Sequence, residues 1–226
     1  MNIIIPEKSA REVIDENFTK EIRVKLQRII YDAYMWSFRL VENTALLNWE
    51  RGKTLLPNIK NVAVEFFLVQ EIKNGNLPLN WRVSYTSNKS ASLIELYKDN
   101  LLLHVNQVTS KNNIARPAFC RDQYIQPFQS YIDFDNNLKF VETVEEKPKY
   151  FQLNHGYQSQ EPLFIALGIP GANRKWIERI QLLDEFVVIE GKYPKSKPED
   201  IKEFSLEEFQ RFAEEVGNNE QKESNS

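Results

Sequence analysis

Apolar residues follow a helical period through the first third of the chain. Over 18–47 they recur at intervals of three and four residues, while charged side chains fall mainly between them. This spacing predicts one long amphipathic helix over Phe18–Leu47. Just before it, Ser9 and Glu12 have the spacing of a capping box, which predicts a short additional helix. The apolar stripe of the long helix consists of Ile22, Leu26, Ile29, Ala33, Trp36 and Leu40.

A second long helix is predicted after Gly52, which interrupts the first pattern. Pro57 suits the first turn of a helix, because the N–H that proline lacks has no helical partner there. Up to Lys73 the apolar residues cover so much of the circumference that we expect this helix to be buried. Gly75 can adopt the left-handed conformation that ends a helix.

Beyond Pro78 the apolar period changes to two, which is typical of β-strands. Asp99-Asn100 and Asp135-Asn136-Asn137 are turn residues, so the strands on either side of each are expected to pair as antiparallel hairpins. The pattern over Asn173–Leu183 fits either a helix or a strand. The predicted strands are Trp81–Tyr85, Leu93–Tyr97, Leu101–Val108, Ser130–Phe134, Leu138–Thr143, Tyr150–Leu153, Leu163–Leu167 and Phe186–Ile189.

The chain is therefore predicted to be a single α+β domain over residues 1–216, in which a helical N-terminal third packs on an antiparallel β-rich region. A capping box at Ser205 and Glu208 opens a short C-terminal helix. No apolar residue follows Gly217, so a disordered tail is predicted at the end. The parts are the two long helices (1–78), the β-rich part (79–192), the linker with the C-terminal helix (193–216) and the tail (217–226).

The 226 residues carry a formal net charge of −3, whereas a protein that binds duplex DNA usually has a strong basic excess. A local basic patch is compatible with this value, because net charge averages over all faces. The single cysteine, Cys120, allows no internal disulfide, as is typical of a reducing compartment. The start does not resemble a signal peptide, and no stretch reaches the ~18 apolar residues of a membrane helix. We expect a cytoplasmic protein without a membrane partner.

The first predicted hairpin brings two chemically active side chains together. Counting back from a two-residue turn at Asp99-Asn100 sets Glu95 opposite His104. A carboxylate beside an imidazole can orient a general base, so Glu95 and His104 are candidate catalytic residues. The favoured interpretation is simpler: a cross-strand polar pair on a solvated sheet face.

Three basic residues lie close together in the segment after this hairpin: Lys111, Arg116 and Arg121. Arginine forks suit phosphates, and the rings of Phe119 and Tyr124 offer surfaces on which bases can stack. The three basic residues are therefore candidate binding residues. A plain solvated loop is the simpler interpretation, because the chain as a whole is acidic.

A predicted hydrophobic strand leads into Glu190 and Lys192. Their Glu-x-Lys spacing resembles the signature of restriction-endonuclease-like nucleases, in which the acid binds a metal and the lysine helps to activate water. Such a Mg²⁺ site needs a second carboxylate. Asp133 or Asp135 could supply it, whereas Asp184 lies too close in sequence for the usual hairpin between the two acids. A strand that ends in a turn explains the same residues.

His155 follows a predicted strand and enters a polar loop, so it is a further candidate binding residue. Two histidines and one cysteine do not supply the usual ligands of a zinc site, and no metal site is predicted outside the nuclease hypothesis. Cys120 stands beside Phe119 and is expected to be a small buried apolar side chain. The sequence contains neither a phosphate-binding glycine loop nor a Gly-x-Ser-x-Gly motif.

Several blocks of the sequence resemble a family of bacterial proteins of about this length to which no activity is attached. The resemblance implies a bacterial cytosolic protein from a prophage or another mobile element. It implies no catalytic residue, but it adds weight to Arg116–Arg121 as a binding segment. The blocks are residues 52–61 (GKTLLPNIKN), Leu93–Leu96, Asn106–Val108, Ala115–Arg121 and Leu167–Pro170 followed by Trp176.

Because no strong catalytic constellation is present, the sequence favours a binding or regulatory module over an enzyme. It would engage a protein or nucleic-acid partner through the sheet face and the Arg116–Arg121 loop, and its apolar helices would form the core or part of a homodimer interface. The alternative is a metal-dependent nuclease with Glu190, Lys192 and Mg²⁺; otherwise no cofactor is expected. A third hypothesis is a hydrolase or transferase, which requires Glu95 and His104 to line a concave pocket.

Overall fold

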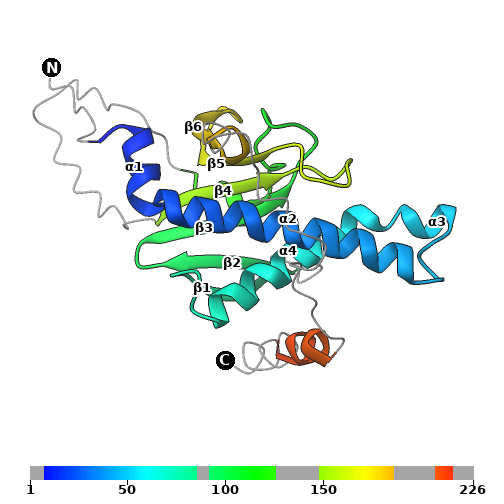
Figure 1. The fold of residues 1–226 in the computed structure, drawn as a ribbon. Helices are drawn as coiled ribbons and strands as arrows, with labels where there is room; N and C mark the ends of the chain where they lie inside the picture. Colours follow the sequence, from blue (N-terminus) through cyan, green and yellow to red (C-terminus); the bar gives the residue numbers. More distant parts are fainter. Residues whose placement is uncertain (1–7, 86–91, 126–147, 186–206, 216–226) are drawn as a thin grey trace, which may run out of the picture.

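The computed structural model describes residues 8–85, 92–125, 148–185 and 207–215. Two long helices, α2 (Lys20–Asn43) and α4 (Leu56–Lys73), cross one face of a six-stranded sheet (Figure 1). The predicted α+β class is confirmed. The strands lie in sequence order across the sheet and are β1 (Asn80–Tyr85), β2 (Ser92–Lys98), β3 (Leu101–Gln107), β4 (Lys149–His155), β5 (Ile165–Pro170) and β6 (Trp176–Gln181).

Capping explains where the first helices begin. Ser9 Oγ accepts a hydrogen bond from the Glu12 N–H at 3.2 Å, and the Glu12 carboxylate accepts one from the Ser9 N–H at 2.7 Å. The predicted capping box therefore opens α1 (Ala10–Asn17). The hydroxyl of Thr19 caps α2. This helix stops at Asn43, short of the predicted Leu47, because the backbone becomes extended at the next residue.

The chain reverses after α2 so that α4 packs back against it. Gly52, in the short helix α3 (Glu50–Lys53), permits this reversal, because a Cβ there would lie 2.5 Å from the Leu47 carbonyl oxygen. Pro57 stands in the first turn of α4 as predicted. Just beyond α4, Gly75 has the predicted left-handed backbone, with φ at 73°.

The sheet is mostly antiparallel, but its central strands β3 and β4 run parallel to each other. The prediction of an antiparallel β-rich region is wrong at this pair. A period of two is common to both kinds of strand and therefore could not reveal the difference. Parallel neighbours require a long crossover connection. The described part of that connection, residues 108–125, contains the short helix α5 (Phe119–Asp122).

The core of the molecule lies between the helices and the sheet. The ring of Phe151 in β4 meets the ring of Phe18, just before α2, edge to face with centroids 5.0 Å apart. Leu103 of β3 is fully buried in the same cluster. Burial of side chains of this size stabilises the fold by about 1.5–3 kcal/mol each. One hydrophobic cluster thus joins the N-terminal helices to the sheet.

A buried arginine ties three helices together. Arg23 of α2 donates two hydrogen bonds to Glu185 of α6 (Leu182–Glu185), at 2.8 and 2.6 Å. It donates others to Asp15 of α1 and to the carbonyl oxygen of Phe18, both at 2.7 Å. The guanidinium of Arg23 is buried, but two carboxylates and a carbonyl oxygen accept its hydrogen bonds. These bonds compensate for its removal from water.

Residues 173–183, for which the sequence allowed a helix or a strand, contain β6 and then the start of α6. Residues 207–215 are helical as predicted, and Phe212 packs on Phe66 of α4 with ring centroids 5.2 Å apart. No helix within the described ranges is long and apolar enough to cross a bilayer. Outside the described residues lie the predicted strands Ser130–Phe134, Leu138–Thr143 and Phe186–Ile189, the linker over 193–206 and the tail.

Candidate functional site

The two faces of β3 and β4 differ in polarity. The face toward the helices carries apolar side chains such as Leu103 and Phe151. The opposite face, which we call the polar face, carries side chains that are also buried. On these two strands the polar ones are His104, Asn106, Tyr150, Gln152 and Asn154, and Leu102 is buried beside them.

Glu95 of β2 lies opposite His104 of β3, as the hairpin register predicted. Glu95 Oε1 accepts a hydrogen bond from His104 Nε2 at 3.0 Å, and Oε2 accepts from Arg82 Nε and Nη2 at 2.8 and 2.7 Å. Glu95 is 1% exposed and His104 is fully buried, so the interpretation as a pair on a solvated face is wrong. Burial alone would raise the pKa of Glu95, but the bonds from His104 and Arg82 outweigh it and hold the pKa below its ordinary value.

The second ring nitrogen of His104 is bonded as well. Its Nδ1 lies 3.0 Å from the hydroxyl of Tyr150, which also accepts a hydrogen bond from Gln152 Nε2 at 3.2 Å. Because a carboxylate only accepts, Nε2 donates its proton to Glu95, and the Tyr150 hydroxyl occupies Nδ1. Burial raises the pKa of Tyr150, which keeps its hydroxyl protonated. With both nitrogens engaged, His104 has no lone pair for a substrate, which argues against the hydrolase or transferase hypothesis.

The network continues through three amides to a second arginine. Gln152 Oε1 accepts a hydrogen bond from Asn154 Nδ2 at 3.3 Å. Asn154 Oδ1 accepts from Asn106 Nδ2 at 3.0 Å, and Asn106 Oδ1 accepts from Arg121 Nε at 3.1 Å. An unbroken chain of hydrogen bonds therefore runs across the polar face from Arg82 to Arg121. Each amide uses both its donor and its acceptor, so the network fixes the orientation of its members.

Residues 109–125, which we call the crossover segment, cover the polar face. The Ala115 N–H donates to Gln152 Oε1 at 2.9 Å, and Asn154 Nδ2 donates to the Asn113 carbonyl oxygen at 3.2 Å. The side chains of β3 and β4 thus lie beneath the segment. The open sheet surface that the binding hypothesis assumed is absent from these two strands, because the crossover connection occupies it.

Two arginines hold the flanks of the crossover segment. Arg179 of β6 donates to the carbonyl oxygen of Lys111, and to Asn112 Oδ1 at 2.8 Å. Arg121 Nη1 donates to the carbonyl oxygen of Arg116 at 2.8 Å. The Arg121 side chain is thus held against the Arg116 backbone, while the side chains of Lys111 and Arg116 are left exposed.

Positive charge accumulates on the crossover face, by which we mean the polar face together with the crossover segment. Among the described residues it has five cations and two carboxylates, Glu95 and Asp122. Within the described ranges only one of the cations, Arg82, forms an ion pair. Because the chain as a whole carries a net charge of −3, this excess belongs to one face. The five cations are Arg82, Lys111, Arg116, Arg121 and Arg179.

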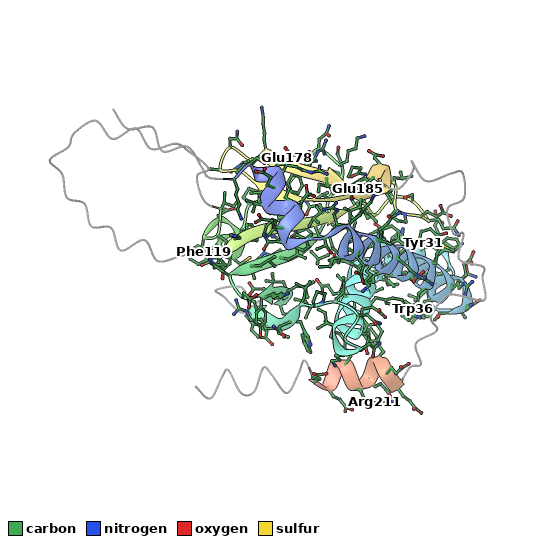
Figure 2. The ribbon with its side chains drawn as sticks, turned by 60° about the vertical axis from the view of Figure 1, so that its left-hand side comes forward. Tyr31, Trp36, Phe119, Glu178, Glu185 and Arg211 are labelled. Atoms are coloured by element: carbon green, nitrogen blue, oxygen red, sulfur yellow. The ribbon has the colours of Figure 1, made fainter. Side chains whose placement is uncertain are left out.

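An aromatic ring stands exposed on the same face. Phe119, the first residue of α5, is 74% exposed. Figure 2 shows it at the edge of the molecule, away from Tyr31 and Trp36 of α2. The neighbouring Cys120 is partly exposed rather than buried as expected, because α5 lies on the surface and buries none of its residues.

His155 does not belong to this site. It is the last residue of β4 and lies on the helix-covered face, where its Nδ1 is 2.9 Å from the Tyr34 hydroxyl and 3.0 Å from the Gly156 carbonyl oxygen. Lys60 Nζ lies 4.7 Å from the centre of the Tyr34 ring. Burial lowers the pKa of His155 to about 4. The ring is fully buried, so a partner cannot reach it as the binding prediction required.

The residues of the nuclease hypothesis fall almost entirely outside the described part of the chain. This applies to Glu190, Lys192, Asp133 and Asp135, so that hypothesis stays a prediction. Asp184 is exposed in α6. Within the described ranges, no three His, Cys, Asp or Glu side chains are grouped so that they could hold a metal ion.

Comparison of the chain with models of protein families, with curated proteins and with solved structures gave no match. The functional assignment therefore rests on the chemistry of the crossover face.

Sequence reasoning missed five members of this face, although one signal was available. In β4 the polar residues Gln152 and Asn154 alternate with apolar Phe151 and Leu153, which is typical of a strand with two unlike faces. The alternation does not say that the polar side is buried, because it looks the same when that side meets water. The missed residues are Arg82, Tyr150, Gln152, Asn154 and Arg179.

Proposed function

We propose that this protein is a binding module that engages an anionic macromolecular partner, either a nucleic acid or an acidic protein, through the crossover face. The proposal rests on the cations of this face that have no carboxylate partner within the described ranges: Lys111, Arg116, Arg121 and Arg179. A cluster of cations attracts a negatively charged partner and speeds its association.

The hydrogen-bond network beneath the segment supports the same proposal. Ordering a loop during association costs conformational entropy, and a loop that is already fixed avoids much of that cost. Here Arg121 and Arg179 fix the crossover segment from below, so Lys111 and Arg116 stand exposed on an ordered backbone. A buried network without an accessible reactive group suits positioning better than chemistry.

The test is binding across a salt series with two double variants that each remove two exposed cations. Lys111→Ala/Arg116→Ala alters the crossover face. Arg51→Ala/Lys53→Ala alters α3, which joins α2 to α4 at the far end of the helical hairpin that these two helices form (Figure 1). The probes are DNA and RNA oligonucleotides, single- and double-stranded, and polyglutamate. Each experiment is run with and without Mg²⁺, and cleavage that needs Mg²⁺ would favour the nuclease hypothesis instead.

We expect at least one probe to bind more weakly as salt rises, since binding releases counterions. The crossover variant should lose at least tenfold in affinity, while the α3 variant stays within about twofold of wild type, because only the crossover cations contact the partner. For a nucleic acid, the loss of two contacts should also lower the salt slope by roughly 1.4 to 1.8. Equal losses in both variants would show that net charge alone matters and would refute the proposal, as would the absence of binding to every probe.

A further inference from the structure

We infer that the partner is a single-stranded nucleic acid, with Phe119 stacking on a base and the surrounding cations contacting phosphates. This inference rests on the proposed function. An acidic protein would be held by the cations alone, so an exposed aromatic ring among them would gain little. A single strand offers both phosphates and unpaired base faces, which suits a surface that combines charge with aromatic rings.

Phe119 is placed where such a ring would be useful. It stands between Arg116 and Arg121 in the sequence, and the hydrogen bond from Arg121 to the Arg116 backbone fixes this short stretch. Base–aromatic stacking strengthens single-strand binding and tolerates any sequence, because every base has a flat face. Phe119 is 74% exposed, so its side chain is accessible for that contact.

A second planar group lies on the same face. The guanidinium of Arg82 stands 5.3 Å from the centre of the Tyr97 ring, and its side chain is 53% exposed. The carboxylate of Glu95 holds this guanidinium in place, because Oε2 contacts both Nε and Nη2 of Arg82. A guanidinium that already rests on an aromatic ring can present its outer side to a base or to a phosphate.

The geometry fits a duplex less well. The major groove is read by a helix or by a two-stranded ribbon that enters it. The helix of this face, α5, spans Phe119–Asp122, about one turn, and the polar face of β3 and β4 lies under the crossover segment. In a duplex the base faces are stacked, so Phe119 could meet one only by forcing the stack apart, which costs energy that a single strand does not require.

The experiment measures fluorescence anisotropy of labelled dT and U oligonucleotides, a duplex of the same length and heparin, a polyanion without bases, at one fixed salt concentration. Phe119→Ala is compared with Phe119→Tyr, which keeps the ring, and with Trp49→Ala, which removes an exposed ring at the N-cap of α3. We expect single strands to bind at least tenfold more tightly than the duplex. Phe119→Ala should weaken single-strand binding about tenfold and heparin binding less than twofold. Phe119→Tyr and Trp49→Ala should both resemble wild type. Because the side chain is exposed, Phe119→Ala should unfold at the wild-type temperature.

The outcomes separate this inference from the proposed function. Equal affinity for single strands and duplex, or unchanged single-strand binding in Phe119→Ala, would overturn the inference. A further outcome is that polyglutamate is the one probe that binds, with binding lost in Lys111→Ala/Arg116→Ala and no oligonucleotide bound. In that case the proposed binding module would stand, and its partner would be an acidic protein. If none of the anionic polymers bound, both would fail.

Discussion

Both faces of β3 and β4 are buried, but by different means. On one face, Phe151 and its apolar neighbours lie under helices and gain stability from removal of their surface from water. On the other, Gln152 and its polar neighbours lie under an irregular segment and exchange bonds with water for bonds with each other. A hydrogen bond contributes only about 1 kcal/mol net, but an unpaired buried group costs more. The helix side therefore supplies most of the stability, and the crossover side supplies a defined position for the segment.

Adjacent residues of β4 give the largest expected contrast. Phe151→Ala should lower the free energy of unfolding by about 4 kcal/mol, because it leaves a cavity against Phe18. Gln152→Ala should lower it by about 2 kcal/mol, because the Ala115 N–H loses its partner in a buried place. Urea denaturation of both variants measures the difference. A larger loss in the Gln152 variant would reverse our assignment of the two faces.

The two buried histidines, one on each face, differ in their hydrogen bonds, and His155 makes stability depend on pH. His104 has both nitrogens bonded, whereas Nε2 of His155 finds no hydrogen-bond partner among the residues that the structure describes. Burial lowers the pKa of His155 to about 4 from the ordinary 6.5, so the unfolded chain binds this proton more readily than the folded protein. The stability that depends on neutral His155 is fully present above pH 6.5 and is lost as the pH falls through 4.

His155→Leu should remove this loss. Relative to wild type, the variant should gain up to about 3 kcal/mol between pH 7 and pH 4, whatever its stability at pH 7. The measurement is the difference in unfolding free energy between the two proteins across this range. Burial raises the pKa of Glu65 to about 7, but Glu65 titrates in both proteins and its effect cancels in the difference. A difference that did not change with pH would contradict the account.

Glu95 tests whether the polar network depends on mutual pairing. Glu95→Leu should cost about 2–3 kcal/mol, because the Nε2–H of His104 is left buried without an acceptor. The losses of Glu95→Leu and His104→Leu should not add in the double variant, since each single variant already breaks the bond between the two side chains. Equilibrium urea unfolding of the wild type, both single variants and the double variant decides the point. A double variant whose loss equals the sum of the separate losses would mean that the two side chains act independently.

The smallest effect is expected at the exposed cations. Lys111→Ala/Arg116→Ala should change the free energy of unfolding by less than about 0.5 kcal/mol, because neither side chain forms an ion pair in the described part of the chain. Thermal unfolding followed by circular dichroism measures this. A large loss would mean that these side chains hold the crossover segment rather than a partner.

Local sequence patterns predicted where helices begin and how one hairpin pairs. Ser9 and Glu12 form the predicted capping box, and Pro57 stands in the first turn of its helix. Asp99 adopts a positive φ of 48°, as the two-residue turn required, so the predicted pairing of Glu95 with His104 followed. These features depend on residues close together in sequence, whose preferences act before any tertiary contact forms.

The candidate site was foreseen only in fragments. Arg116 and Arg121 were recognised by composition, but the hydrogen bond from the Arg121 side chain to the Arg116 carbonyl oxygen depends on the folded segment. The bond between Arg82 and Glu95 depends on the pairing of β1 with β2. The sequence predicted both strands but not that they pair with each other. His155 was placed in a polar loop, because residues after a strand are usually exposed, and it lies in the core instead.

The sequence by itself determined α1, α2 and α4 in outline, the helix over 207–215, most of the described strands and the register of one hairpin, because period, capping and turn chemistry are local. Only the tertiary structure decided that β3 and β4 are parallel, since that choice depends on where a long connection travels. The same connection buries the polar face and is held by Arg179, which comes from a distant part of the chain. Local patterns do not encode such long-range encounters, because each side chain would show the same pattern on an open sheet.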